Sequence, residues 1–170
     1  MRGAVAIRSH PADDATARGL LAAYRHELDE RFGGFDEALS PSAGPNELAP
    51  PGGTVLVLYE GRRPVGCGGL KTLAPGVGEI KRMYVVPAAR GRGHARRLLE
   101  ALEDAAPALG HRRVRLDTAA SMPEARTLYE SAGYRPVADY NANPYAAFWF
   151  EKAIAPSRSS RPWCCWWSRR

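Results

Sequence analysis

A turn rich in glycine and arginine, residues 90–95, is the segment of the sequence best suited to hold an anion. It reads Arg-Gly-Arg-Gly-His-Ala and joins a predicted strand to a predicted helix. Glycines let several backbone N–H groups converge, and the helix adds the positive end of its dipole. Guanidinium groups add further charge, from Arg90, Arg92, Arg96 and Arg97. The segment therefore predicts a phosphate site, although a solvated basic helix start would have the same residues.

The elements around this turn follow one another as strands and helices. Apolar alternation and buried runs predict strands at residues 5–8, 54–59, 65–73, 78–86, 113–117, 134–138 and 145–152. Helical spacing predicts helices at residues 13–32, 94–109 and 123–132. Residues 33–53 are rich in Gly, Pro and Ser and predict a long loop, with a short helix around residues 36–39. This order predicts an α/β fold, a mixed sheet with helices on both faces.

Two motifs within this arrangement resemble those of the GNAT superfamily of N-acetyltransferases. The pattern Arg90-x-x-Gly93-x-Ala95, after the strand end Met-Tyr-Val-Val-Pro, resembles motif A. The pattern Ala125-x-x-Leu128-Tyr129-Glu130-x-x-Gly133-Tyr134 resembles motif B, and Met122 stands where many members have asparagine. The resemblance covers about residues 5–152. It implies the GNAT fold, a mostly antiparallel sheet of about six or seven strands that is splayed in the middle.

The resemblance also implies acetyl-CoA as the cofactor and indicates which residues hold it. Backbone of residues 83–85 would pair with the pantetheine arm, and N–H groups of residues 91–95 would bind the pyrophosphate. The expected cofactor-binding residues are Met83, Tyr84, Val85, Arg90, Gly91, Arg92, Gly93, His94, Ala95 and Arg96.

Acetyl transfer to an amine requires two proton movements. The attacking amine must be neutral, and the leaving thiolate departs more easily when it is protonated. Glu79 stands where some GNAT members carry a glutamate base, but it could instead bind the substrate ammonium or pair with Lys81 or Arg82. Tyr129 matches the motif-B tyrosine that points at the cofactor sulfur, and its alternative role is an aromatic cover for the helix end. Cys67 has no histidine in an obvious pairing position, so a nucleophilic role is not expected.

Two segments are expected to surround the acceptor. Residues 27–37 carry five acids and one base, and an acidic rim there would suit a cationic amine, although a solvated helix end has the same composition. Residues 139–145 join the last two strands, a position that often closes over the acceptor in this family. The expected substrate-binding residues are Phe32, Phe35, Lys81, Arg82, Tyr140 and Tyr145. An amino-acid-like or polyamine-like small molecule is expected, and a protein lysine or N-terminus is the alternative.

Composition bounds the remaining possibilities. The chain has 170 residues and a net charge of +6, but residues 155–170 hold four arginines and no acid. We therefore predict an acetyltransferase domain at residues 1–154, a disordered tail at residues 155–170, and no nucleic-acid partner. No metal, membrane or secretory signal is expected, which favours the cytoplasm. A homodimer would be ordinary for the family. The rival to an enzyme is a domain that binds acyl-CoA without turnover.

Overall fold

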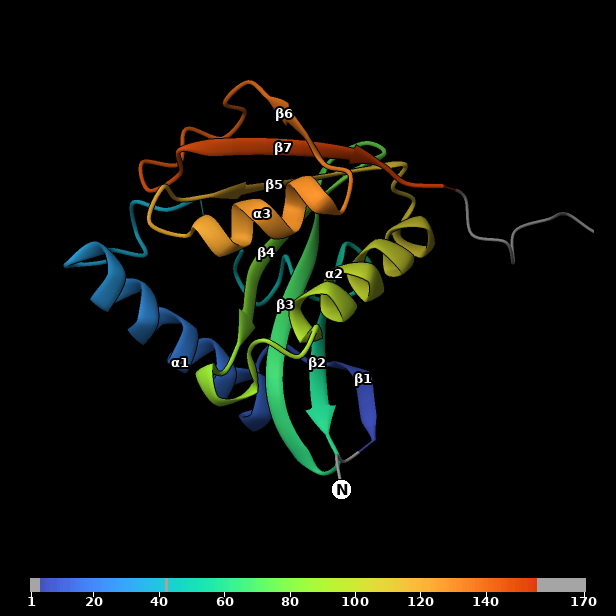
Figure 1. Ribbon diagram of the computed structural model, residues 1–170. Helices are drawn as coiled ribbons and strands as arrows, with labels where there is room; N and C mark the ends of the chain where they lie inside the picture. Colours follow the sequence, from blue (N-terminus) through green and yellow to red (C-terminus); the bar gives the residue numbers. More distant parts are fainter. Residues whose placement is uncertain (1–3, 42, 156–170) are drawn as a thin grey trace, which may run out of the picture.

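The computed structural model describes residues 4–41 and 43–155. Within these ranges the strands form one seven-stranded sheet with the order β1-β2-β3-β4-β5-β7-β6 (Figure 1). The strands are β1 (Val5–His10), β2 (Gly53–Glu60), β3 (Arg63–Ala74), β4 (Val77–Val85), β5 (Arg113–Thr118), β6 (Arg135–Val137) and β7 (Phe148–Ala153). The predicted tail falls almost entirely outside the described residues.

The sheet divides between β4 and β5. These two strands run parallel and pair over a short stretch, where Val77 to Glu79 lie opposite Arg113 to Arg115. The other neighbouring strands pair antiparallel. Beyond Glu79 the backbone of β4 turns away, and Arg82 adopts a left-handed conformation with φ of 57°. The predicted mixed sheet that splays in its middle is therefore confirmed.

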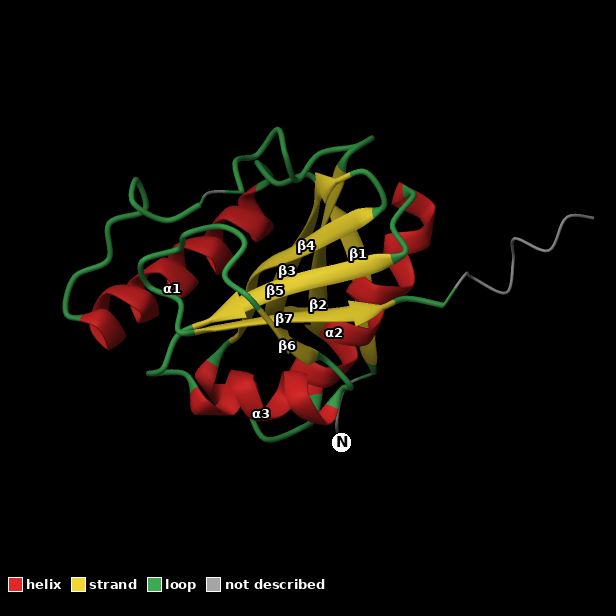
Figure 2. Cartoon of the chain, turned by 90° about the horizontal axis from the view of Figure 1, so that it is seen from above, coloured by secondary structure: helices red, strands yellow, loops and turns green. Residues whose placement is uncertain are grey.

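Helices cover both faces of the sheet. Figure 2 shows α1 (Ala15–Phe32) on one side, with α2 (His94–Ala105) and α3 (Pro123–Ser131) on the other. Alternation along β2 explains the two layers, because successive side chains of a strand point to opposite faces. Leu56 and Leu58 belong to the core beneath α2 and α3, whereas Val57 and Tyr59 pack against α1.

The predicted helix ends agree with local capping. The Asp14 side chain accepts a hydrogen bond from the Ala17 amide and begins α1, and Gly33 ends it with φ of 65°. The predicted helix at residues 94–109 ends earlier and continues as the 3-10 turn η2 (Ala106–Leu109), and another such turn, η1 (Pro87–Ala89), follows β4.

The short helix predicted around residues 36–39 is wrong. The chain forms turns there, because the Asp36 carboxylate accepts a hydrogen bond from the Ala38 amide and stabilises a local bend instead. In the part of the chain that the structure describes, no helix is long and apolar enough to span a bilayer.

Candidate active site

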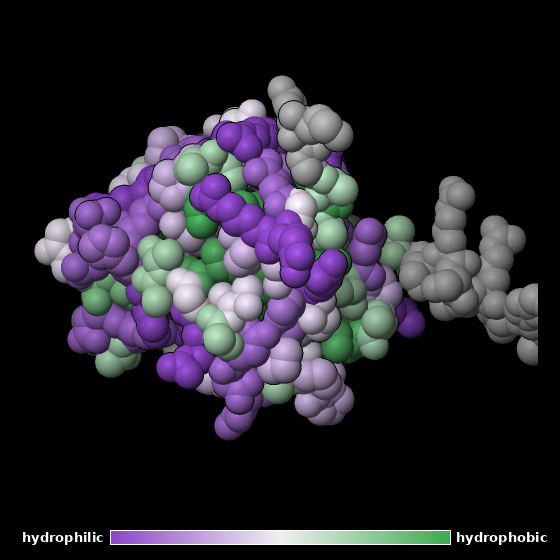
Figure 3. Space-filling model, turned by 90° about the horizontal axis from the view of Figure 1, so that it is seen from below, coloured by the Kyte–Doolittle hydropathy of each residue, from purple (hydrophilic) through white to green (hydrophobic). Residues whose placement is uncertain are grey.

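A cavity of about 490 Å³ opens where β4 and β5 separate. Its walls come from α1, β4, the end of β5, α3 and the turn before α2. A hollow with hydrophobic residues between hydrophilic ones is visible near the middle of the face shown in Figure 3. One continuous space therefore reaches from the glycine-rich turn to the end of α1, which suits two substrates that must meet.

The glycine-rich turn forms one end of this cavity. Gly91 and Gly93 have φ of 72° and 77°, and Gly93 is the N-cap of α2. Among the described residues, no acceptor takes the backbone N–H of residues 91–96. These amides lie at a helix N-terminus, where unpaired donors and the helix dipole favour a phosphate.

The arginines of this turn have different partners. Arg90 donates to the Val85 carbonyl at 2.8 Å and pairs with Glu27, and Arg96 donates to Ser131 at 2.6 Å. Both line the cavity. Arg92 instead binds Glu60 at 3.0 Å and lies outside the lining that the described residues form.

His94 lines the same end of the cavity and is 4% exposed. Its Nε2 lies 2.7 Å from Glu60, and hydrogen bonds from His94 and Arg92 hold the pKa of Glu60 below its ordinary value. The other ring nitrogen, Nδ1, is buried and has no hydrogen-bond partner among the described residues. The remaining predicted cofactor residues, Met83, Tyr84, Val85, Gly91, Gly93 and Ala95, also line the cavity.

Tyr129 of α3 lines the middle of the cavity. It is 7% exposed and packs against Tyr134 and Phe150, with ring centroids 5.9 and 6.3 Å away. Burial raises its pKa well above that of an ordinary tyrosine, so the phenol keeps its proton. Its hydroxyl makes no hydrogen bond to another described residue. Tyr24 of α1, which sequence analysis missed, also lines the cavity, and burial raises its pKa too.

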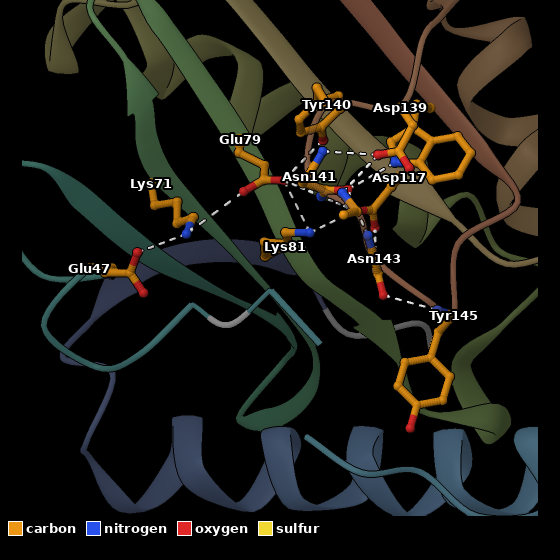
Figure 4. Close-up of polar contacts among 12 residues, drawn as sticks. Glu47, Lys71, Glu79, Lys81, Asp117, Asp139, Tyr140, Asn141, Asn143 and Tyr145 are labelled. Atoms are coloured by element: carbon orange, nitrogen blue, oxygen red, sulfur yellow. Dashed lines mark hydrogen bonds and ion pairs between the residues drawn. The ribbon is translucent and has the colours of Figure 1, made fainter. Parts of the chain in front are cut away.

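Glu79, the predicted base, lies behind the cavity rather than in its wall. Its side chain is 1% exposed, and the cavity lining formed by the described residues does not include it. Figure 4 shows its carboxylate among donors: Tyr140 hydroxyl at 2.9 Å, Asn141 amide at 3.1 Å and Lys81 ammonium at 3.1 Å. Lys71 lies 3.8 Å from the other carboxylate oxygen. Direct contact with a substrate in the cavity would require this cluster to open.

Asp117, at the end of β5, is the carboxylate that does reach the cavity. It accepts hydrogen bonds from Lys81 at 2.8 Å, Asn141 at 2.5 Å and Asn143 at 3.3 Å. Lys81 therefore lies between Asp117 and Glu79 (Figure 4). Sequence analysis did not name Asp117, although an acid at the end of a strand beside motif A was a usable signal.

Three aromatic rings form the wall at the end of α1. Phe32 and Tyr145 stack with centroids 5.1 Å apart, and Phe35 lies 4.9 Å from Tyr145. The Tyr145 hydroxyl accepts a hydrogen bond from the Asp36 amide at 2.8 Å, which ties the two loops together. Tyr140 is not part of the lining that the described residues form, and its hydroxyl binds Glu79 instead.

The acidic segment at residues 27–37 is largely occupied by its own contacts. Three of its acids pair with basic side chains: Glu27 with Arg31 and Arg90, Glu30 with His26, and Glu37 with Arg25 and Arg82. The other two accept hydrogen bonds from backbone amides, Asp29 from Phe35 and Asp36 from Ala38. These acids therefore cap turns and neutralise arginines, which leaves little free negative charge for a cationic acceptor.

Cys67 is a free cysteine buried in β3. Burial raises the pKa of its thiol to about 12. A thiol that rarely ionises is a poor nucleophile. The geometry therefore gives no support to a covalent intermediate at this residue.

A split mixed sheet with a glycine-rich turn beside the split is the arrangement that the resemblance to acyl-CoA-dependent acyltransferases implies. The acetyltransferase (GNAT) family model matches residues 20–134, and the chain belongs to this family. It is 34% identical over 146 residues to the IAA acetyltransferase of Azospirillum brasilense, which covers 83% of this chain and 92% of that protein. It is 32% identical over 145 residues to the N-acetyltransferase YsnE of Bacillus subtilis, covering 82% and 96% of the two chains.

A solved GNAT acetyltransferase from Elizabethkingia anophelis with acetyl-CoA bound has the same fold. It superposes with a TM-score of 0.62 at 15% identity and covers 88% of this chain and 98% of that chain. GNAT acetyltransferases use acetyl-CoA, so the predicted enzyme class and cofactor are confirmed. The individual site residues stay predictions.

Proposed function

We propose that the enzyme transfers the acetyl group of acetyl-CoA directly to a primary amine of a small molecule while both are bound. The observation that carries this proposal is the continuity of the cavity, which joins the unpaired amides of residues 91–96 to the aromatic wall at the end of α1. A small molecule fits better than a protein lysine, because the Phe32–Phe35–Tyr145 wall bounds the cavity at that end.

The residues at hand fit the cofactor. The amides of residues 91–96 would hold the pyrophosphate, with Arg90 and Arg96 beside it. The edge of β4 beyond Glu79 has no partner in β5, so its backbone at residues 83–85 could pair with the pantetheine arm, although the Val85 carbonyl already accepts a hydrogen bond from Arg90. Acetyl-CoA supplies an activated thioester carbonyl for the amine to attack.

Two side chains of the cavity would then move the protons. Asp117 would take a proton from the attacking amine, because its carboxylate lines the cavity. Tyr129, which its raised pKa keeps protonated, would donate its proton to the leaving sulfur. Solvent would then return a proton to Tyr129 and accept the one that Asp117 took from the amine. Glu79 would not touch the amine. It would act by holding Lys81 in place, because the Lys81 ammonium pairs with both Glu79 and Asp117.

The proposal can be tested by incubating the enzyme with acetyl-CoA and each of a panel of amines, and by measuring the release of the free thiol of CoA. We expect saturable release of CoA with at least one small primary amine and little with lysine-containing peptides. Saturable acetyl-CoA binding without release for any amine would instead support a domain that binds acyl-CoA without turnover.

A further inference from the structure

The charged side chains at the acceptor end of the cavity are already paired with one another. Arg25, Lys81 and Arg82 line this end together with Glu37 and Asp117. Asp117 binds Lys81, which also lies 3.1 Å from Glu79, and Glu37 binds the two arginines. An acceptor with its own carboxylate could take the place of one of these acids, whereas a polyamine has no group that could do so.

Glu37 holds a place that a substrate carboxylate could take. Arg25 of α1 donates to one of its oxygens at 3.2 Å, and Arg82 of β4 donates to the other at 2.6 Å. Two guanidinium groups from different elements thus converge on one carboxylate, and each donates one charge-assisted hydrogen bond to it. The Glu37 side chain is 38% exposed and belongs to the loop after α1, so it can leave without unfolding a helix or strand.

The aromatic wall is connected to the carboxylate that would receive the amine. The Tyr145 amide donates to the Asn143 side chain at 3.1 Å, and the Asn143 amide group donates to Asp117 at 3.3 Å. Figure 4 shows Asn143 between these two residues. A ring stacked on the wall would therefore lie at the same end of the cavity as Asp117.

We infer that the acceptor is an aromatic amino acid, whose carboxylate displaces Glu37 from Arg25 and Arg82 while its ring packs on Phe32, Phe35 and Tyr145. Its amine then faces Asp117. This inference rests on the proposed function and narrows it to one substrate class.

Four amines that differ in single features test it with acetyl-CoA: phenylalanine, phenethylamine, alanine and spermidine. Phenethylamine keeps the ring and the amine but lacks the carboxylate, and alanine lacks the ring. We expect kcat/KM for phenylalanine to exceed that for phenethylamine by at least about tenfold, since hydrogen bonds between charged groups are lost. Alanine and spermidine should be poorer still.

Two variants that remove charges of opposite sign make the test sharper. Arg25→Gln should raise KM for phenylalanine by about threefold to tenfold, because one guanidinium group is lost. Glu37→Gln should lower KM for phenylalanine by about threefold, because the competing charge is gone. Both variants should leave KM for phenethylamine unchanged. Arg126→Gln is the matched control, since Arg126 pairs with Glu130 at similar exposure and lies outside the cavity lining formed by the described residues.

The outcomes separate this inference from the proposed function. Efficient turnover of phenethylamine or spermidine with no advantage for phenylalanine would overturn the amino-acid assignment and leave the acetyltransferase standing. A rise in KM for every amine in both Arg25→Gln and Glu37→Gln would mean that the ion pair serves only to hold the loop, which also overturns the inference. No turnover of any amine, with acetyl-CoA bound, would remove the proposed function itself.

Discussion

At the α2 end of the cavity the groups that face a ligand are unpaired backbone amides, whereas at the α1 end they are side chains already bound to one another. The amides of residues 91–96 have no acceptor among the described residues. Asp117, Arg82 and Glu37 each have a charged partner within 2.8 Å. One end is therefore ready for its ligand, and the other must exchange partners when a ligand arrives.

This difference teaches how the two ends can change. A site built from backbone amides depends on a few glycines and little on the identity of the side chains around it. A site built from ion pairs depends on which side chains meet, so a few substitutions there alter the acceptor. Changes at the cofactor end should therefore affect CoA binding, and changes at the acceptor end should affect turnover.

The largest expected effect is at the acceptor end. Asp117→Asn should lower kcat by about 1000-fold, because an amide cannot take the proton of the attacking amine. The remaining rate should rise about tenfold per pH unit, since a free alkyl amine becomes more common up to its pKa near 10.4. Steady-state rates between pH 6 and 9 measure both. The exposed Asp104→Asn should keep the rate, and an unchanged kcat in Asp117→Asn would remove its assignment.

Tyr129, between the two ends, should have the next largest effect. Tyr129→Phe should lower kcat by about 100-fold without changing CoA affinity, because the donor to the leaving sulfur is lost. The raised pKa of Tyr129 also means that the wild-type rate should not fall as pH rises toward 10. Tyr134→Phe is the control, since Tyr134 packs on Tyr129 but does not belong to the described cavity lining. Equal rates in the two variants would contradict the acid role.

Glu79→Gln distinguishes direct contact from action through Lys81. Glutamine keeps an oxygen that accepts hydrogen bonds from Tyr140 and Asn141. It removes one of the two negative charges that Lys81 contacts and leaves the other, on Asp117. We expect kcat to fall by about tenfold, less than for Asp117→Asn, when rates are corrected for the folded fraction measured by circular dichroism. A loss as large as that of Asp117→Asn would return Glu79 to the position of the direct base.

The smallest expected effect is at the cofactor end. Gly93→Ala should weaken CoA binding by about fivefold, because a Cβ obstructs the approach of a phosphate to the turn. Gly110 has nearly the same backbone conformation, with φ of 82° against 77°, and the space around a Cβ is open at both positions. Gly110→Ala should therefore carry similar strain but leave CoA binding unchanged in calorimetry. Weaker binding in both variants would indicate a general loss of stability.

The same comparison explains what the sequence could predict. The predicted cofactor residues come from consecutive positions in the strand–turn–helix at 83–96, so local patterns were sufficient to propose them, and most of them line the cavity. Element order, caps and the split sheet were likewise predicted, because periodicity and turn residues encode them locally.

The acceptor end could not be predicted to the same extent. Glu79 was chosen for its place on β4, but the sequence does not mark where β4 and β5 separate, and Glu79 lies where they still pair. Asp117 meets Lys81 and Asn143 through contacts between residues 26 to 36 positions apart. The partners of the acidic segment at residues 27–37 are also set by tertiary packing, which a local charge count does not reveal.

The central claim is that both substrates occupy one cavity and that the acetyl group passes directly between them. Initial rates with acetyl-CoA and the amine varied together test this most directly. Direct transfer predicts intersecting double-reciprocal lines and no acetyl label on the protein when labelled acetyl-CoA is added without amine. Parallel lines, or stable labelling of the chain, would contradict the account.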